Sequence, residues 1–323
     1  MNPSPNRPNR FFRFLGIGPS TPRRVAGAAG LLAGVVVLTG LTDDICESVA
    51  RAAKTASFRE AEADYWLGVA KCRNGPQGSR RQCIRDLHDE LEEARDLARE
   101  QFEAREEVCE LVGEGPYNPH ISPAEFSPDV TNPYYPLVPG RTLVYEKVDR
   151  DGVERTEVTT LADVVEIADV RCRPVRDVVR ENGQIVEDTT DWFSQDAAGN
   201  AWYFGEIALN YEDGFLDNID GSWRFGKDGA QPGIIMKANP RRNDAYRQEY
   251  LINEAEDVAR VVALGEVVMV RAGRFENCVK TEDFSALEPG SREWKFYATG
   301  IGLVLEVNPR TGSRNELIQI IGP

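Results

Sequence analysis

The chain has 323 residues, 41% of them hydrophobic and 28% charged, which is a globular composition with room for one large or two ordinary domains. The formal net charge is -15. Because residues 1–42 carry five arginines and no acid, the remainder carries about -20, and we expect no nucleic-acid partner for so acidic a chain. The two histidines, His88 and His120, leave no histidine after residue 120 for a nucleophilic triad within the later part of the chain.

An uncharged apolar run occupies residues 25–41. It follows Arg23 and Arg24 and precedes Asp43 and Asp44, which predicts an export signal with its N-terminus in the cytoplasm. Seventeen residues are few for a spanning helix, and no clear Ala-x-Ala site follows, so a cleaved signal peptide and a retained transmembrane signal-anchor both remain open. Either way we expect an extracytoplasmic protein: periplasmic, secreted, or anchored to the cytoplasmic membrane through residues 25–41.

Four cysteines, Cys46, Cys72, Cys83 and Cys109, are spaced symmetrically about a short Asn-Gly-Pro segment, since the first two are 26 positions apart and so are the last two. If both arms are helical, each cysteine pair spans about 39 Å along its arm, and the arms fold back as a hairpin over residues 43–113. An oxidising compartment would keep all six cysteines as disulfides. The spacings do not fit a zinc site. The predicted pairs are Cys46–Cys109, Cys72–Cys83 and Cys172–Cys278.

Each arm of the hairpin shows an apolar seam with steps of three and four residues, which is typical of packed helices. Between the seam positions lie many charged residues, which predicts a solvated outer face and makes His88 a surface residue. The expected seam of the first arm is Val49, Ala53, Ala56, Ala63, Leu67 and Ala70, and that of the second arm is Ile84, Leu87, Leu91, Ala94 and Ala98.

A proline-rich segment over residues 114–133 predicts a linker. Residues 134–323 then alternate short β-branched and aromatic runs with hairpin turn pairs such as Asn182-Gly183 and Asp213-Gly214, which predicts an antiparallel β domain. The expected fold class is α+β: an N-terminal disulfide-clamped helical hairpin followed by a mostly antiparallel curved β-sheet or half-barrel.

Several landmarks of the later part resemble an uncharacterised family of exported bacterial β-rich proteins. They are residues 132–140 (NPYYPLVPG), 199–206 (GNAWYFGE), 232–236 (PGIIM) and 297–303 (YATGIGL). The resemblance covers about residues 130–308 and implies a fold without implying an activity. Thr299 stands where the family commonly has proline. A looser similarity is to the curved sheets of lipoprotein-carrier and lipocalin-like proteins, which is an analogy of fold alone.

Aromatic residues recur along the expected strands, where they line either a packed core or a ligand cavity. The candidate ligand-binding residues are Trp192, Trp202, Phe204, Trp223, Trp294 and Tyr297. We assign no catalytic residue, no metal site and no cofactor. Carboxylate pairs do offer a route to hydrolysis, and the acids nearest aromatic residues are Asp191, Glu206, Glu249 and Glu293.

Three functions therefore compete. The first is a non-catalytic binding module that holds a small apolar or amphipathic ligand in the curled sheet. The second is a cell-envelope structural or interaction protein, in which the hairpin is a spacer and an envelope protein is the partner. The third, with less support, is a carboxylate-dependent hydrolase.

Overall fold

The computed structural model describes residues 44–149 and 152–323. These residues form two compact units, one ending near residue 117 and the other continuing to the end of the sequence. The expected export signal at residues 25–41 lies outside the described ranges. Among the residues that are described, no helix is both long and apolar enough to cross a membrane.

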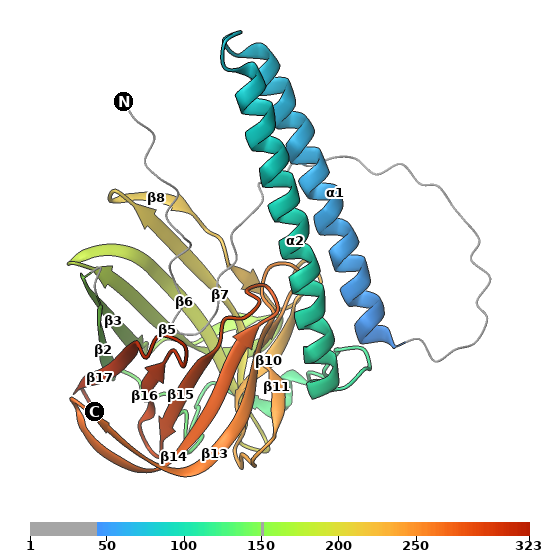
Figure 1. Ribbon diagram of the computed structural model, residues 1–323. Coiled ribbons are helices and arrows are strands. Elements are labelled where there is room, and N and C mark those ends of the chain that lie inside the picture. The colour runs from blue at the N-terminus through green and yellow to red at the C-terminus, as the bar shows by residue number, and fades with distance from the viewer. Residues whose placement is uncertain (1–43, 150–151) are drawn as a thin grey trace. The chain divides into compact units, whose positions relative to one another are not determined.

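The first unit is a pair of antiparallel helices, α1 (Ile45–Asn74) and α2 (Arg80–Val112), which lie side by side (Figure 1). The Asp44 side chain caps α1 by accepting a hydrogen bond from the backbone N–H of Glu47 at 3.0 Å. At the same end of the pair, Gly113 terminates α2 with a φ of 100°, a backbone conformation that favours glycine.

Two disulfides join the helices at opposite ends of the pair. Cys46 pairs with Cys109 and Cys72 pairs with Cys83, and in each bridge the two Cα atoms are 5.8 Å apart. Both pairings match the symmetric spacing of the cysteines. The prediction of a disulfide-clamped helical hairpin is therefore confirmed.

The seam between the helices differs from the expected one, most of all along the second half of α1. Leu67 is 52% exposed and Val69 is buried. The other predicted seam residues that are exposed are Ala56, Ala63, Ala70 and Ala94. The seam instead passes through Gly68, because a Cβ atom there would lie 2.5 Å from the Leu87 side chain of α2. A glycine carries no hydrophobic signal, so the sequence pattern placed the seam on the apolar neighbours of Gly68.

The second unit is β-rich. Its strands, with the short 3-10 helix η1 (Pro123–Glu125), are β1 (Phe126–Ser127), β2 (Thr142–Asp149), β3 (Gly152–Thr160), β4 (Val165–Ile167), β5 (Val170–Glu181), β6 (Gln184–Asp196), β7 (Ala201–Glu212), β8 (Phe215–Asn218), β9 (Trp223–Arg224), β10 (Gln231–Met236), β11 (Ala245–Arg247), β12 (Glu249–Tyr250), β13 (Asp257–Val270), β14 (Gly273–Ser285), β15 (Glu293–Ala298), β16 (Gly302–Val307) and β17 (Arg314–Ile321).

These strands form one antiparallel sheet that curls until its two ends meet. Consecutive strands are neighbours almost throughout, and β17 pairs with β2 to join the late strands to the early ones. The pairings β10–β7 and β1–β6 then connect the ends of the sheet. The result is nearly a barrel, as Figure 1 shows, and it confirms the expected fold class.

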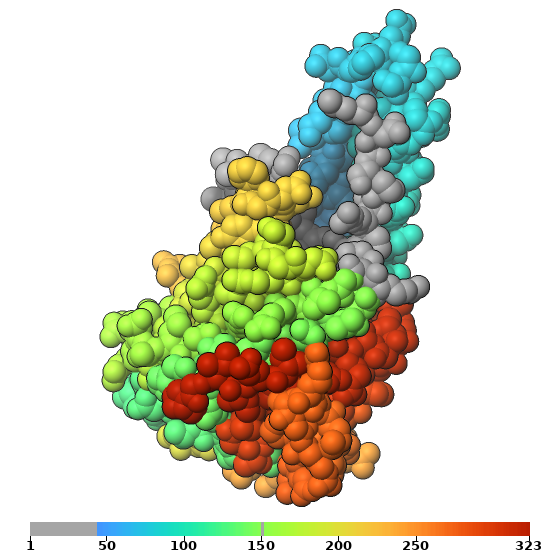
Figure 2. All heavy atoms as spheres, turned by 90° about the vertical axis from the view of Figure 1, so that its left-hand side faces the viewer, coloured from blue at the N-terminus to red at the C-terminus, as the bar shows by residue number. Residues whose placement is uncertain are grey.

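The turns of the sheet follow local sequence chemistry. Asn182 and Gly183 connect β5 to β6 with φ values of 47° and 87°, and Asp213 and Gly214 connect β7 to β8 with φ values of 51° and 81°. Positive φ at both central residues produces a tight hairpin turn whose twist matches that of the strands. In Figure 2 the last residues of the chain (dark red) lie between the orange β13–β14 hairpin and the green early strands.

Cys172 and Cys278 are not bonded to each other, and the predicted third disulfide is wrong. Cys172 on β5 lies in a small apolar cluster with Trp192 and Phe204, whereas Cys278 on β14 belongs to the main core of the unit. The two cysteines were paired by elimination, because they remained after the hairpin cysteines had been paired. The prediction failed because each thiol is buried in a different apolar cluster.

The second half of the proline-rich segment is integrated into the β unit. Strand β1 pairs with β6, with Phe126 opposite Asp196, and Val130 is buried in the main core. The buried Asn132 side chain donates hydrogen bonds to the backbone oxygens of Gly199 at 2.9 Å and Met236 at 3.2 Å. This segment therefore links strands that are far apart in the sequence.

Candidate functional site

Four buried carboxyl groups converge on the inner face of the curled sheet. Asp191 on β6 lies directly opposite Glu206 on β7, and Asp177 on β5 is opposite Thr189, two residues from Asp191. Glu249 on β12 completes the group, and all four side chains are at most 4% exposed. We call Asp177, Asp191, Glu206 and Glu249 the carboxylate cluster.

Aromatic donors hold two members of the cluster. The Tyr203 hydroxyl donates to Asp191 Oδ1 at 2.5 Å, and the Trp223 indole N–H donates to Glu249 Oε2 at 2.7 Å. The Tyr203 ring stacks on Phe193 at 4.7 Å and meets the Trp223 ring edge-on at 5.2 Å. These contacts fix the carboxylates in a packed interior.

A glycine makes this arrangement possible. Gly205 has a φ of 135°, and a Cβ atom there would lie 2.5 Å from the Trp223 backbone oxygen. The absence of a side chain lets β9 pair closely with β7, with Glu206 opposite Trp223. The Trp-Tyr-Phe-Gly-Glu run of β7 therefore encodes both the aromatic packing and the position of the acid.

Burial raises the pKa of one member of the cluster and of its tyrosine partner. The pKa of Asp177 is raised well above its ordinary value, first by loss of solvent and then by the negative charges of Asp191, Glu187, Glu306 and Glu206. Its Oδ1 atom has no hydrogen-bond partner among the described residues. The pKa of Tyr203 is raised by the same two causes. Asp177 and Tyr203 therefore favour their neutral, protonated forms.

A second group of buried charges is centred on Lys295 of β15. Its ammonium lies 3.4 Å from Asp283 Oδ2 and 3.8 Å from Glu306 Oε1. Asn315 donates to the other oxygen of Glu306 at 2.9 Å. Burial alone would lower the pKa of Lys295, but the surrounding acids, Asp283 first, outweigh it and raise that pKa. Lys295 thus remains a cation that neutralises its acidic neighbours.

The same surroundings raise the pKa values of two carboxyl groups near Lys295. Burial is the largest cause for both and raises the pKa of Glu306 to about 7, although Lys295 and Asn315 act against the shift. The pKa of Glu293 is also raised by burial and by the charge of Glu306. Glu306 therefore changes its protonation state near neutral pH inside the packed interior.

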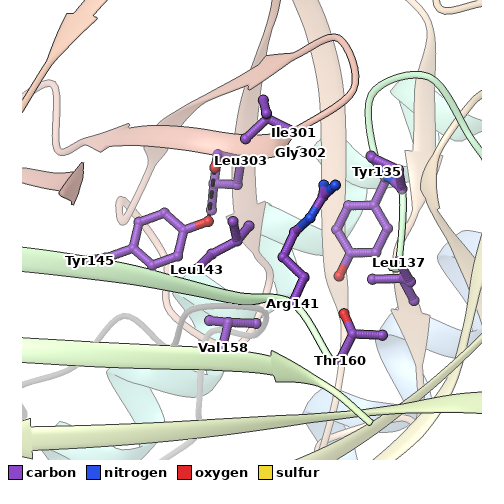
Figure 3. A pocket seen from close by; sticks show the side chains of 11 residues that line it. Tyr135, Leu137, Arg141, Leu143, Tyr145, Val158, Thr160, Ile301, Gly302 and Leu303 are labelled. Carbon is purple, nitrogen blue, oxygen red and sulfur yellow. Dashed lines mark hydrogen bonds between the residues drawn. The ribbon is translucent and has the colours of Figure 1, made fainter. Parts of the chain in front are cut away.

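A pocket opens beside this interior, between the loop that precedes β2 and the turn between β15 and β16 (Figure 3). Leu137, Leu143 and Ile301 form apolar walls, the Thr160 side chain and the Tyr135 ring lie at one side, and Arg141 reaches across it. The volume of the pocket that a water-sized sphere can occupy is about 30 Å³. That space suits the end of an alkyl chain or a few waters.

Hydrogen bonds fix the shape of the pocket. Tyr145 donates through its hydroxyl to the backbone oxygen of Leu303 at 2.8 Å, which ties β2 to β16. Arg141 donates to the backbone oxygens of Gly300 at 3.1 Å and Pro323 at 2.9 Å, which leaves its positive charge at the rim. The Asn132 side chain accepts from the backbone N–H of Tyr135 at 3.1 Å and so positions that ring.

The six aromatic residues proposed from the sequence as ligand-binding fall in three places. Trp192, Trp202 and Phe204 belong to a small apolar cluster under Phe126, whose ring meets that of Phe204 at 5.3 Å. Trp223 and Tyr297 lie in the main core. The structure brings together the first three and separates them from the next two.

The sixth, Trp294, lies on a different face. The Lys280 ammonium is 3.4 Å from the centre of its ring and 5.3 Å from that of Phe296. Burial lowers the pKa of Lys280. None of the six proposed aromatics lines the pocket of Figure 3. Arg141 and Ile301, which do line it, lie in a loop and a turn. The alternation of apolar and polar residues along strands does not indicate which loop side chains face a pocket.

The four acids named from the sequence are all buried, with Asp191, Glu206 and Glu249 in the carboxylate cluster and Glu293 beside Lys295. Sequence reasoning missed Asp177 and Glu306. Both occupy inward positions of strands rich in valine and leucine, so a charged residue at a core position was the signal that could have identified them. In the described residues, no group of three or more His, Cys, Asp or Glu side chains is arranged to hold a metal ion.

Comparisons with known proteins give one distant match. No protein-family profile matches the chain, and no curated protein matches it. The chain is similar to a crystal structure from Parabacteroides distasonis described as a putative lipoprotein, with 14% identity and a TM-score of 0.33, over 58% of this chain and 98% of that one. So low a score carries no argument about function. The β-rich fold is therefore established by the structure of this chain alone. The comparisons do not show that the chain belongs to the exported family.

Proposed function

We propose that the β domain is a non-catalytic binding module outside the cytoplasm and that it takes the apolar end of an amphipathic ligand in the pocket of Figure 3. The observation that carries this proposal is the pairing of apolar walls, made by Leu137, Leu143 and Ile301, with the Arg141 guanidinium at the rim. An alkyl chain matches the walls and an anionic head group matches the rim.

Two further features support this function. Two disulfides in the hairpin are typical of an oxidising compartment, which fits the export signal expected at residues 25–41. Asp191 and Glu206 are packed beneath aromatic rings with exposures of 1% and 4%. Carboxylates that a substrate does not reach favour a binding role over hydrolysis.

The test compares two ligands with the same ten-carbon chain and opposite head groups. We expect decanoate to bind, as measured by isothermal titration calorimetry, and decyltrimethylammonium to bind at least about tenfold more weakly because of Arg141. Ile301→Trp fills the pocket and should remove decanoate binding. The matched control is Ile219→Trp, since Ile219 is an exposed residue outside the pocket. Equal binding of both ligands, or undiminished binding by Ile301→Trp, contradicts the proposal.

A second function, a spacer in the cell envelope, is favoured by the geometry of the hairpin. Helices of 30 and 33 residues are about 45 to 50 Å long, and a disulfide closes each end. Crosslinking in intact cells, with a photoreactive residue placed in turn at exposed hairpin positions such as Ile45 and Leu97, tests this function. Recovery of the same envelope protein at several positions along the hairpin is the expected result.

A further inference from the structure

The two helices of the hairpin have an uneven distribution of charge. Between Asp64 and Asp86 the chain carries five basic residues and no acid. The rest of the hairpin, over residues 44–64 and 86–113, carries sixteen acids and six basic residues. The five basic residues lie around the Cys72–Cys83 disulfide, and we call them the basic tip: Lys71, Arg73, Arg80, Arg81 and Arg85.

The charges of the basic tip are not neutralised within the described residues. All five side chains are exposed, and none of them forms an ion pair there, whereas Arg51, Arg59, Arg95 and Arg99 elsewhere in the hairpin all do. Arg80 donates only to the backbone oxygen of Gly75, at 3.0 Å. The tip therefore presents a concentrated positive charge to the solvent.

Apolar side chains lie next to these charges. Trp66 is 63% exposed and Leu67 is 52% exposed. Residues seven or four apart share one face of a helix, so Trp66 lies on the face of Arg73 and Leu67 on that of Lys71. Trp66 and Arg73 are about 10 Å apart along the helix axis at 1.5 Å per residue. The tip thus combines an exposed indole, an exposed aliphatic side chain and cations.

We propose that the basic tip, with Trp66 and Leu67, docks onto the surface of an anionic phospholipid bilayer. Basic residues are attracted to anionic head groups, and tryptophan with an aliphatic neighbour partitions into the boundary between head groups and acyl chains. A polyanion in water would satisfy the cations but would leave Leu67 without a partner. The combination of charge complementarity and apolar exposure favours the bilayer.

The disulfide gives this surface its shape. Cys72 and Cys83 join the last turn of α1 to the first turn of α2, so the cations on both helices are held close together before binding. A preformed cluster loses less conformational freedom on binding than a flexible loop does. Reduction of this bridge should therefore weaken binding without changing the charge.

The test measures binding of the full-length protein, held in phosphatidylcholine nanodiscs, to immobilised bilayers by surface plasmon resonance, and every variant keeps residues 1–42 unchanged so that their contribution is the same in all proteins compared. We expect binding to bilayers with one quarter phosphatidylglycerol and little binding to phosphatidylcholine alone. The fourfold variant K71Q/R73Q/R81Q/R85Q should bind at least about 100-fold more weakly, since each basic residue near an anionic surface contributes about a fivefold factor.

The matched control is K227Q/R241Q/R242Q/R310Q, which removes four exposed positive charges from the β domain, none of which forms an ion pair among the described residues. It should bind as the wild-type protein does. A second variant, W66S/L67S, should still bind the anionic bilayer at low salt. It should lose the part of the wild-type binding that persists in 0.5 M NaCl. Helical circular dichroism confirms that each variant is folded.

Three outcomes overturn the proposal. In the first, the tip variant and the control lose binding equally. In the second, the protein binds phosphatidylcholine as strongly as the anionic bilayer. In the third, it ignores both bilayers and binds soluble polyphosphate, which reassigns the tip to a dissolved polyanion. The failure of decanoate binding in the pocket would leave all three measurements unaffected, so the two proposals are tested separately.

Discussion

The hairpin and the β domain are held together by different means. The hairpin buries only a narrow seam, which includes Ala50, Ala53, Val69 and Ala98, and disulfides close both of its ends. The β domain buries a large apolar core and several charged groups, and its two cysteines remain thiols. The hairpin thus depends on covalent bonds at its two ends, whereas the β domain depends on a packed core that contains buried ion pairs.

The strongest test of this comparison removes the buried cation of the β domain. Lys295→Met leaves Asp283, Glu306 and Glu293 without their counter-charge, and we expect a loss of roughly 3 to 5 kcal/mol in the free energy of unfolding of the β domain. Guanidine denaturation followed by near-UV circular dichroism measures it. Lys227→Met, at an exposed position, should change stability by less than about 0.5 kcal/mol. Equal effects of both variants would show that the interior charges are not coupled.

The next test removes each disulfide of the hairpin. In the chain-entropy model the Cys46–Cys109 bridge, with a separation of 63 residues, contributes about 4 kcal/mol, and the Cys72–Cys83 bridge, with a separation of 11, about 3 kcal/mol. Paired Cys→Ser variants should lower the thermal midpoint of the helical signal in that order. A reversed order, or a shift in the β-domain transition, would contradict the assignment of stability to the bridges.

The raised pKa of Glu306 predicts that the free energy of unfolding of the β domain depends on pH. The folded pKa of Glu306 is about 7 against 4.5 for an ordinary glutamate, so between these values the native state binds more protons than the unfolded state. Stability that is fully present below pH 4.5 is therefore lost as the pH rises through 7. The expected loss is on the order of 2 to 3 kcal/mol.

Glu306→Gln is the control for this pH effect. The amide keeps an acceptor for Asn315 and cannot titrate, so the slope of stability between pH 4.5 and 7 should flatten. Urea denaturation at five pH values measures the slope. Stability that rises across this interval, or an unchanged slope in the variant, would sink the assignment to Glu306.

The sequence predicted the features that depend on spacing. Equal intervals between the cysteines gave the hairpin and its two bridges, and the Asn182-Gly183 and Asp213-Gly214 pairs marked turns of an antiparallel sheet. Both signals are local, because cysteine spacing measures length along a helix and a positive φ depends on one or two residues.

The candidate site was harder to predict because it depends on which faces of distant strands pack against each other. Trp192 and Phe193 are neighbours in sequence, but alternation along β6 sends one to the small cluster with Phe204 and the other to the main core. Gly68 and Gly205 matter through close approach, which leaves no hydrophobic signal. The pocket residue Arg141 acquires its role from Gly300 and Pro323, which lie more than 150 residues away in sequence.

The smallest expected effect concerns the cysteines of the β domain. Burial raises the pKa of both thiols, that of Cys278 to about 11, and both side chains are buried. Dithiothreitol should therefore lower the midpoint of the helical transition and leave the β-domain transition within about 1 °C. Ellman's reagent should find no reactive thiol in the native protein and two in guanidine. If no thiol appears in guanidine, Cys172 and Cys278 are bridged after all, and the contrast between a covalently closed hairpin and a packed β domain fails.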